Sequence, residues 1–192
     1  MNRPLTPLAL AVLHMLAEQP MHPYEMRQRI RDHGIDYAIK VTHGSLYHAV
    51  ERLADQGFIE AVETSRAGRR PERTVYAITE EGKDEALSQL RSMIVRPVQE
   101  YPALGAALTF ARMLPPEELA LLLRRRTVAV EARIAAHDTI IDGLRKQGVD
   151  RIGLIEVEYC QAVLRAELDW LRAAEDDITS GRLQWQETGQ EI

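Results

Sequence analysis

The sequence predicts a mainly α protein with two parts, on the strength of three observations. Residues 6–57 contain three amphipathic segments, each opening with a helix-start signal. Residues 58–64 and 73–79 then read FIEAVET and RTVYAIT, two short runs of the kind that form strands. After the prolines at 97 and 102, apolar residues recur only at helical spacings, so the second part is predicted to be all-helical.

The first helix is predicted to begin after Thr6, a good N-cap residue, with Pro7 in the first helical position, where its missing N–H costs nothing. It is expected to end at Gln19 and Pro20. Its apolar face consists of Leu8, Val12, Leu13 and Leu16.

A second helix is predicted to open the same way at His22 and Pro23, and to end near His33 and Gly34. Its apolar residues are Tyr24, Met26 and Ile30. The third helix, THGSLYHAVERLADQG, begins at Thr42 and closes with Gly57 in the position that favours a left-handed backbone. Its buried stripe is predicted to be Leu46, Val50 and Leu53.

The two strand-like runs are joined by SRAGRRPE, a turn-forming loop with arginines at 66, 69 and 70. Another helix is predicted from Thr79, with Glu80 and Glu81 in its first turn, to about Val95. Three helices followed by a β-hairpin with a basic tip form the plan of a winged helix-turn-helix. We expect this domain to occupy residues 1–96.

The second part, residues 97–182, is predicted to contain a helix over 103–113, a long helix from Pro115 to Gly148, and a last helix over 151–179. A short tail is expected at 183–192. The long helix has a sustained apolar seam of Leu119, Leu123, Thr127, Val130, Ile134, His137, Ile141 and Leu144.

The last helix carries two apolar stripes, which need two neighbours. One stripe passes through Ile155, Tyr159, Ala162 and Ala166. The other, which we assign to a dimer interface, consists of Val157, Leu164, Leu168, Leu171 and Ile178. The chain offers only one long helix to cover these stripes. A second subunit would cover the other stripe, so we predict a homodimer. The alternative is that both stripes pack within one chain.

Composition narrows the class of protein. Cys160 is the only cysteine, which excludes an internal disulfide and a multi-cysteine zinc site. The net charge is −5, but residues 1–96 hold 13 basic and 13 acidic residues whereas residues 97–192 hold 11 and 16. The acidity therefore lies in the second half, and the charge balance leaves room for a basic surface in the first half. His14 and Glu18 break the apolar start, so we expect a buried helix there and no membrane segment. Because Cys160 is the only cysteine, a reducing cytoplasm is the expected compartment.

The polar start of THGSLYHAVERL has some features of an enzyme site. Ser45 and His48 could touch on a helix, but no carboxylate is evident to orient His48, and no strand leads into the serine. His43 and His48 diverge by about 140° around a helix and so do not form a metal pair. Neither an enzyme, a metal site nor a cofactor is predicted.

The same residues suit a surface that binds DNA. Ser45, His48 and Arg52 are predicted to lie opposite the apolar stripe, on the helix that enters the major groove of a helix-turn-helix complex. Phosphate contacts are expected near the helix start and base contacts from His48 and Arg52. The predicted DNA-binding residues are Thr42, His43, Ser45, Tyr47, His48 and Arg52 on the helix, with Arg66, Arg69, Arg70 and Arg73 at the hairpin.

Residues 5–85 resemble the PadR family of bacterial transcriptional regulators. The resemblance is carried by PYEM at 23–26, GSLYH at 44–48, LADQGFI at 53–59 and YAITEEG at 76–82. The departures are Pro23 where the family has glycine, His48 for proline and Ala54 for glutamate. His48 lies on the predicted DNA face, so the bases that are read stay open.

The resemblance implies a longer family member with a C-terminal helical dimerisation domain. Such proteins are typically homodimeric repressors that bind an operator in double-stranded DNA and are released by small aromatic or hydrophobic effectors. Candidate effector-lining residues are Tyr101, Phe110, His137 and Tyr159. Two alternatives remain: a MarR-like regulator, disfavoured because a dimerisation helix would normally precede the winged helix, and a winged-helix protein–protein adaptor, which would not need the hairpin arginines.

Overall fold

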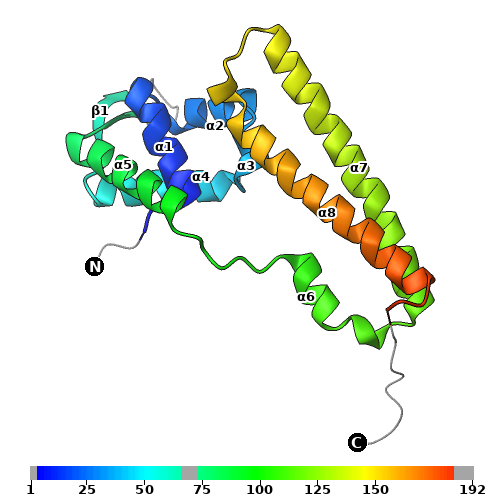
Figure 1. Ribbon diagram of the computed structural model, residues 1–192. Helices are drawn as coiled ribbons and strands as arrows, with labels where there is room; N and C mark the ends of the chain where they lie inside the picture. Colours follow the sequence, from blue (N-terminus) through cyan, green and yellow to red (C-terminus); the bar gives the residue numbers. More distant parts are fainter. Residues whose placement is uncertain (1–3, 66–72, 184–192) are drawn as a thin grey trace, which may run out of the picture. The chain divides into compact units, whose positions relative to one another are not determined.

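The computed structural model describes residues 4–65 and 73–183. The chain divides into two compact units, Met1–Gln99 and Glu100–Ile192. Each unit builds its own core and is considered separately. Figure 1 shows the elements of both.

The first unit contains five helices and a hairpin among its described residues. They are α1 (Pro7–Glu18), α2 (Pro23–Asp32), α3 (Ile35–Ala38), α4 (His43–Asp55), β1 (Ile59–Ser65), β2 (Arg73–Ile78) and α5 (Glu80–Val95). The three predicted helices, the hairpin and the following helix are confirmed. The four-residue α3 is an addition that the sequence pattern does not predict.

Capping interactions explain where these helices begin. Thr6 Oγ1 accepts a hydrogen bond from the backbone N–H of Ala9, and His22 with Glu25 forms a capping box at the start of α2. Gly57 ends α4 with a φ of 75°. The two helix starts thus depend on a side chain within three residues, and the end of α4 depends on a glycine backbone.

The hairpin strands pair antiparallel, with Ile59 opposite Ile78 and a register irregularity between Ala61 and Glu63. A third segment joins them, because Met21 and Tyr76 exchange both backbone hydrogen bonds, at 3.0 and 3.1 Å. The connection between α1 and α2 therefore extends the hairpin sheet by one bridge.

Apolar faces of α1, α2, α4 and the hairpin meet in one core, in which Val12, Leu13, Met26, Leu46 and Leu53 are inaccessible to solvent. Tyr24, one of the apolar residues named for α2, is 56% exposed, whereas Met26 and Ile30 are buried. The core holds α4 by one face only, so its other face is available.

The second unit is all-helical over its described residues, as predicted. It comprises α6 (Ala103–Thr109), the 3₁₀ turn η1 (Ala111–Met113), α7 (Pro116–Lys146), the 3₁₀ turn η2 (Arg151–Gly153) and α8 (Ile155–Thr179). In Figure 1, α7 and α8 run side by side in opposite directions. The predicted seam of α7 is confirmed: Leu119, Leu123, Thr127, Val130 and Ile141 are buried.

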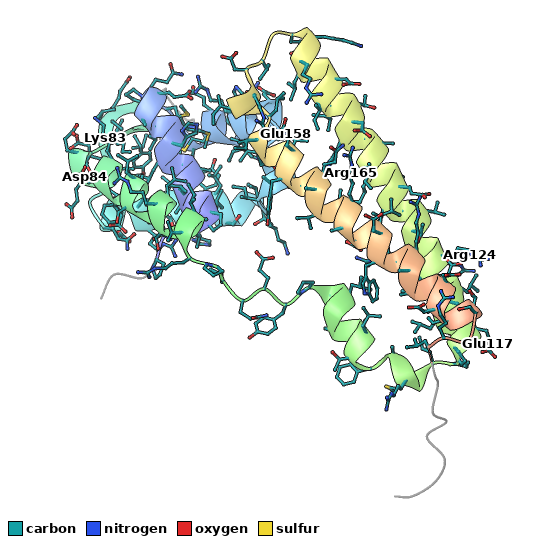
Figure 2. All side chains as sticks on the ribbon, in the orientation of Figure 1. Lys83, Asp84, Glu117, Arg124, Glu158 and Arg165 are labelled. Carbon is teal, nitrogen blue, oxygen red and sulfur yellow. The ribbon has the colours of Figure 1, made fainter. Side chains whose placement is uncertain are left out.

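Ion pairs flank the α7–α8 seam, and Figure 2 labels two of their arginines, Arg124 on α7 and Arg165 on α8. They join Arg124 to Glu175 at 2.7 Å, Arg126 to Glu167 at 2.5 Å, Arg172 to Glu131 at 2.6 Å and Arg165 to Asp138 at 3.5 Å. Because these side chains are mostly exposed, each pair contributes little, and the apolar seam supplies the main stabilisation.

The dimer-interface assignment on α8 requires a correction. Leu164, Leu168 and Leu171 pack with Leu119, Leu123 and Val130 of α7 in the core of a single chain, where Ile178 also packs. Leu171 is fully buried and has no surface left for a partner. The stripe left uncovered is the other one, in which Ile155 and Tyr159 are 56% and 70% exposed.

Candidate nucleic-acid interface

The start of α4 is held by a reciprocal pair of hydrogen bonds. Thr42 Oγ1 accepts from the backbone N–H of Ser45 at 3.2 Å, and Ser45 Oγ accepts from the backbone N–H of Thr42 at 2.9 Å. Ser45 Oγ also lies 2.9 Å from the carbonyl oxygen of Thr42, to which its hydroxyl donates. These bonds set the point from which α4 projects.

The hydrogen bonds of Ser45 and His48 also test whether this segment could be an enzyme site. Glu51 Oε2 lies 3.3 Å from His48 Nδ1, so a carboxylate is present beside His48, contrary to our expectation. The serine end of a relay is missing, because the Ser45 hydroxyl donates to a backbone carbonyl. His48 and Glu51 are also largely solvent-exposed, which does not suit a general base held in a pocket.

The exposed face of α4 coincides only in part with the predicted face. His48 is 82% and Glu51 68% exposed, whereas Arg52 is only partly exposed. The sequence-based prediction missed Glu51, although a spacing of three from His48 places it on the same face. Ser45 and Tyr47 are half-buried at the edge of this face, and His43 is the first residue of the helix.

A hollow of about 530 Å³ opens beside this face. It lies within the first unit, between the start of α1, the α3–α4 connection and α4. Its lining residues are Thr6, Pro7, Leu8, Ala38, Ile39, Lys40, Ser45, His48, Ala49 and Arg52. Three of the predicted DNA-binding residues, Ser45, His48 and Arg52, therefore share one concave surface.

The hairpin arginines are described only in part. Arg66, Arg69 and Arg70 lie outside the described residues. Arg73 is the first residue of β2, where it pairs with Ser65. The strands therefore lead into the basic loop, and its DNA contacts stay a prediction.

The four predicted effector-lining residues do not form one pocket in the described part of the second unit. Phe110 lines an apolar hollow of about 290 Å³ between α6, η1 and α7, but Tyr101, His137 and Tyr159 do not. Tyr101 and Tyr159 are 87% and 70% exposed. His137 is on α7, and its Nδ1 is buried without a hydrogen-bond partner among the described residues.

Metal ligands and membrane segments are not found in the part of the chain that the structure describes. No group of three or more His, Cys, Asp or Glu side chains in residues 4–65 and 73–183 is placed to hold a metal ion. No helix within the same ranges is long and apolar enough to cross a membrane.

Three packed helices, a wing hairpin and an uncovered polar face on α4 define a winged helix-turn-helix protein. Residues 12–88 match the model of the transcriptional regulator PadR-like family. Over this stretch, which includes the winged-helix part, the chain is similar to the PadR-like transcriptional regulators, a family whose members are not enzymes. No curated protein matches the sequence.

Solved structures match over most of the chain. Bacillus subtilis PadR in complex with operator DNA has a TM-score of 0.71 at 18% identity, with 90% of this chain and 99% of that chain covered. The same protein in complex with p-coumaric acid has a TM-score of 0.71 at 17% identity, covering 90% and 98%. The Vibrio cholerae virulence activator AphA has a TM-score of 0.65 at 17% identity, covering 91% and 99%. These likenesses show that the second unit, too, has the fold of these regulators.

Proposed function

We propose that the chain is a homodimeric repressor that binds a pseudo-palindromic DNA operator through α4 and is released by a small aromatic or hydrophobic effector. One observation carries the DNA-binding part: α4 is held by a single buried face and presents the side chains of His48 and Glu51, which are 82% and 68% exposed, beside the cationic residue Arg52. A helix presented in this way fits the major groove. As a regulator of bacterial genes, the protein would act in the cytoplasm.

The proposed contacts divide by type. The residues at the start of α4, with Tyr47, would contact phosphates, whereas His48 and Arg52 would reach base edges. Arg66, Arg69, Arg70 and Arg73 would contact the adjacent backbone or minor groove from the wing.

The binding of p-coumaric acid by Bacillus subtilis PadR supports an effector of that general kind. Tyr101, Phe110, His137 and Tyr159 stay candidates for its site. The proposed mechanism is a shift in population between dimers whose α4 helices match two half-sites and dimers whose spacing does not.

The test is a gel-shift measurement on the promoter DNA beside the protein's own gene, against random DNA of the same length, over a range of salt concentrations. We expect at least about a thousandfold preference for the promoter. Replacing Arg69 and Arg70 with glutamine should reduce the salt slope by about one for each phosphate that the wing then fails to bind. Equal affinity for both DNAs would refute sequence-specific binding and favour a winged-helix adaptor of proteins.

A further inference from the structure

The hollow beside α4 is lined by both apolar and polar residues. Pro7, Leu8, Ala38, Ile39 and Ala49 supply the apolar part, from the start of α1, the α3–α4 connection and the middle of α4. Thr6, Lys40, Ser45, His48 and Arg52 supply the polar part. The hollow thus offers an apolar surface and hydrogen-bond donors to the same occupant.

The charged residues that line the hollow have one sign. Lys40 and Arg52 line it, and no carboxylate among the described residues does. Lys40 is exposed, and none of the ion pairs among the described residues of the first unit includes it. Elsewhere in the first unit, Arg29 pairs with Glu18 and Lys83 pairs with Glu80. An uncompensated cation at this place therefore favours an anionic occupant.

We propose that this hollow seats one sugar–phosphate unit of the DNA backbone beside the major groove. The deoxyribose would pack on Pro7 and Ile39, and the phosphate would bind Lys40. The assignment rests on the proposed function and adds to it two contact points outside α4 and the wing, namely Lys40 and the first turn of α1.

The chemistry of the backbone matches the lining. Each repeat of DNA joins a largely apolar sugar to a singly charged phosphate, and lysine binds phosphate as a compact point charge. A phosphate held here would fix the register and angle of α4 in the groove without reading sequence. Neutralising it would also release a condensed counterion.

The experiment compares the full-length wild-type protein with Lys40→Gln, Lys40→Arg and Lys83→Gln. Affinities for the promoter DNA and for random DNA are measured by fluorescence anisotropy from about 50 to about 200 mM salt. We expect Lys40→Gln to weaken both affinities by the same factor, about threefold to tenfold, and to reduce the salt slope by about 0.9. Lys40→Arg should retain the wild-type slope. Lys83→Gln, which removes an exposed lysine from α5, should leave both affinities unchanged.

Several outcomes would overturn the proposal. An unchanged slope for Lys40→Gln, with wild-type promoter binding intact, would refute the backbone seat and leave the proposed function standing. Loss of affinity for the promoter alone would make Lys40 a reader of bases. If the wild-type protein binds neither DNA, the backbone seat and the proposed function fail together.

A second readout separates the DNA backbone from a small anion as the occupant. The amide signals of Ile39 and Lys40 are followed by NMR during titration with sodium phosphate, sodium benzoate or the promoter DNA. Shifts that saturate with DNA at micromolar concentration, and not with either small anion below about 10 mM, support the proposal. Saturation by benzoate below that limit would identify a small-molecule site instead.

Discussion

At the scale of single residues, Gly82 occupies a position that leaves no room for a side chain. A Cβ atom there would lie 2.0 Å from the carbonyl oxygen of Phe58, and a backbone oxygen cannot swing away as a side chain could. The same turn is tied down by Thr79, whose hydroxyl donates to the carbonyl oxygen of Gly57 at 2.8 Å and accepts from the N–H of Gly82 at 3.1 Å. The Thr-x-x-Gly spacing therefore lets α5 begin directly against the end of α4.

We expect Gly82→Ala to lower the free energy of unfolding of the first unit by about 1–3 kcal/mol, because the backbone must shift to admit the methyl group. The measurement is urea unfolding followed by circular dichroism. The control is Gly44→Ala, since a Cβ on Gly44 meets nothing within 4 Å. Equal stability of the two variants would show that the α4–β1 turn yields without cost.

Cys160 provides a residue-scale prediction about pH. Partial burial, and then the hydrogen bond that its thiol donates to Glu156 at 3.1 Å, raise its pKa to about 11. At pH 8 about one thiol in a thousand is then ionised, so reaction with iodoacetamide should be slow and should accelerate about tenfold per pH unit up to about pH 10. Glu156→Gln should speed the reaction at pH 8. A rate that levels off near pH 9 would contradict the prediction.

The same shift has a consequence for stability. The folded state holds the thiol proton more tightly than the unfolded chain, whose cysteine has a pKa near 9. This contribution to the free energy of unfolding is therefore complete below pH 9 and is lost as the pH rises toward 11.

At the scale of elements, the α7–α8 seam contains a buried polar residue, Thr127, whose hydroxyl lacks a hydrogen-bond partner among the described residues. Thr127 is 9% exposed and lies one turn from Leu123 and Val130 in the seam. An unsatisfied buried hydroxyl costs free energy that a methyl group of the same size does not.

We expect Thr127→Val to raise the free energy of unfolding of the second unit by about 1 kcal/mol, measured by urea unfolding. Thr139→Val is the matched control on the same helix, because the exposed Thr139 hydroxyl donates to the carbonyl oxygen of Ala135 at 2.9 Å. It should change stability by less than about 0.5 kcal/mol. A loss of stability in Thr127→Val would indicate that the hydroxyl is satisfied in solution.

Elements were predictable where their cause is local. The caps at Thr6, Thr42 and Thr79 act within three residues, and the strands carry their own β-branched pattern. The helix α3 has only four residues, which is too short to show a helical periodicity, so the local sequence does not predict it. The Met21–Tyr76 bridge joins positions far apart in the sequence. It depends on how α1 packs against the sheet, so the local sequence does not predict it.

The candidate site shows the same division. Helical spacing predicted that His48 turns away from the core, but the predicted face did not include Glu51, which is exposed beside it. Lys40 and the start of α1 line the hollow through a tertiary contact, which spacing within α4 does not reveal. On α8, periodicity separated two apolar stripes correctly, yet it carries no information on which stripe α7 covers.

At the scale of the whole molecule, the uncovered stripe of α8 is the surface to which we now assign the proposed dimer. The stripe comprises Ile155, Tyr159, Ala162, Val163, Ala166 and Trp170, all exposed in the single chain. It lies on the side of α8 opposite the residues that pack on α7, and about 15 residues of helix extend over about 22 Å. A continuous apolar surface of that length is typical of a subunit interface.

A variant with both Tyr159→Glu and Ala166→Glu should convert the dimer to a folded monomer, because two like charges from each subunit would meet in a closed isologous contact. Light scattering at micromolar concentration gives the mass. Ala135→Glu, on an exposed part of α7 near Glu131 and Asp138, should leave the dimer intact.

If the protein follows the proposed function, the monomer should lose affinity for the full palindrome yet bind an isolated half-site as the wild type does. The reason is that α4 is unchanged and only the one-turn spacing of two copies is removed. A wild-type protein that is monomeric at this concentration would contradict the interface, and a charged double variant that remains dimeric would place the contact elsewhere on the second unit.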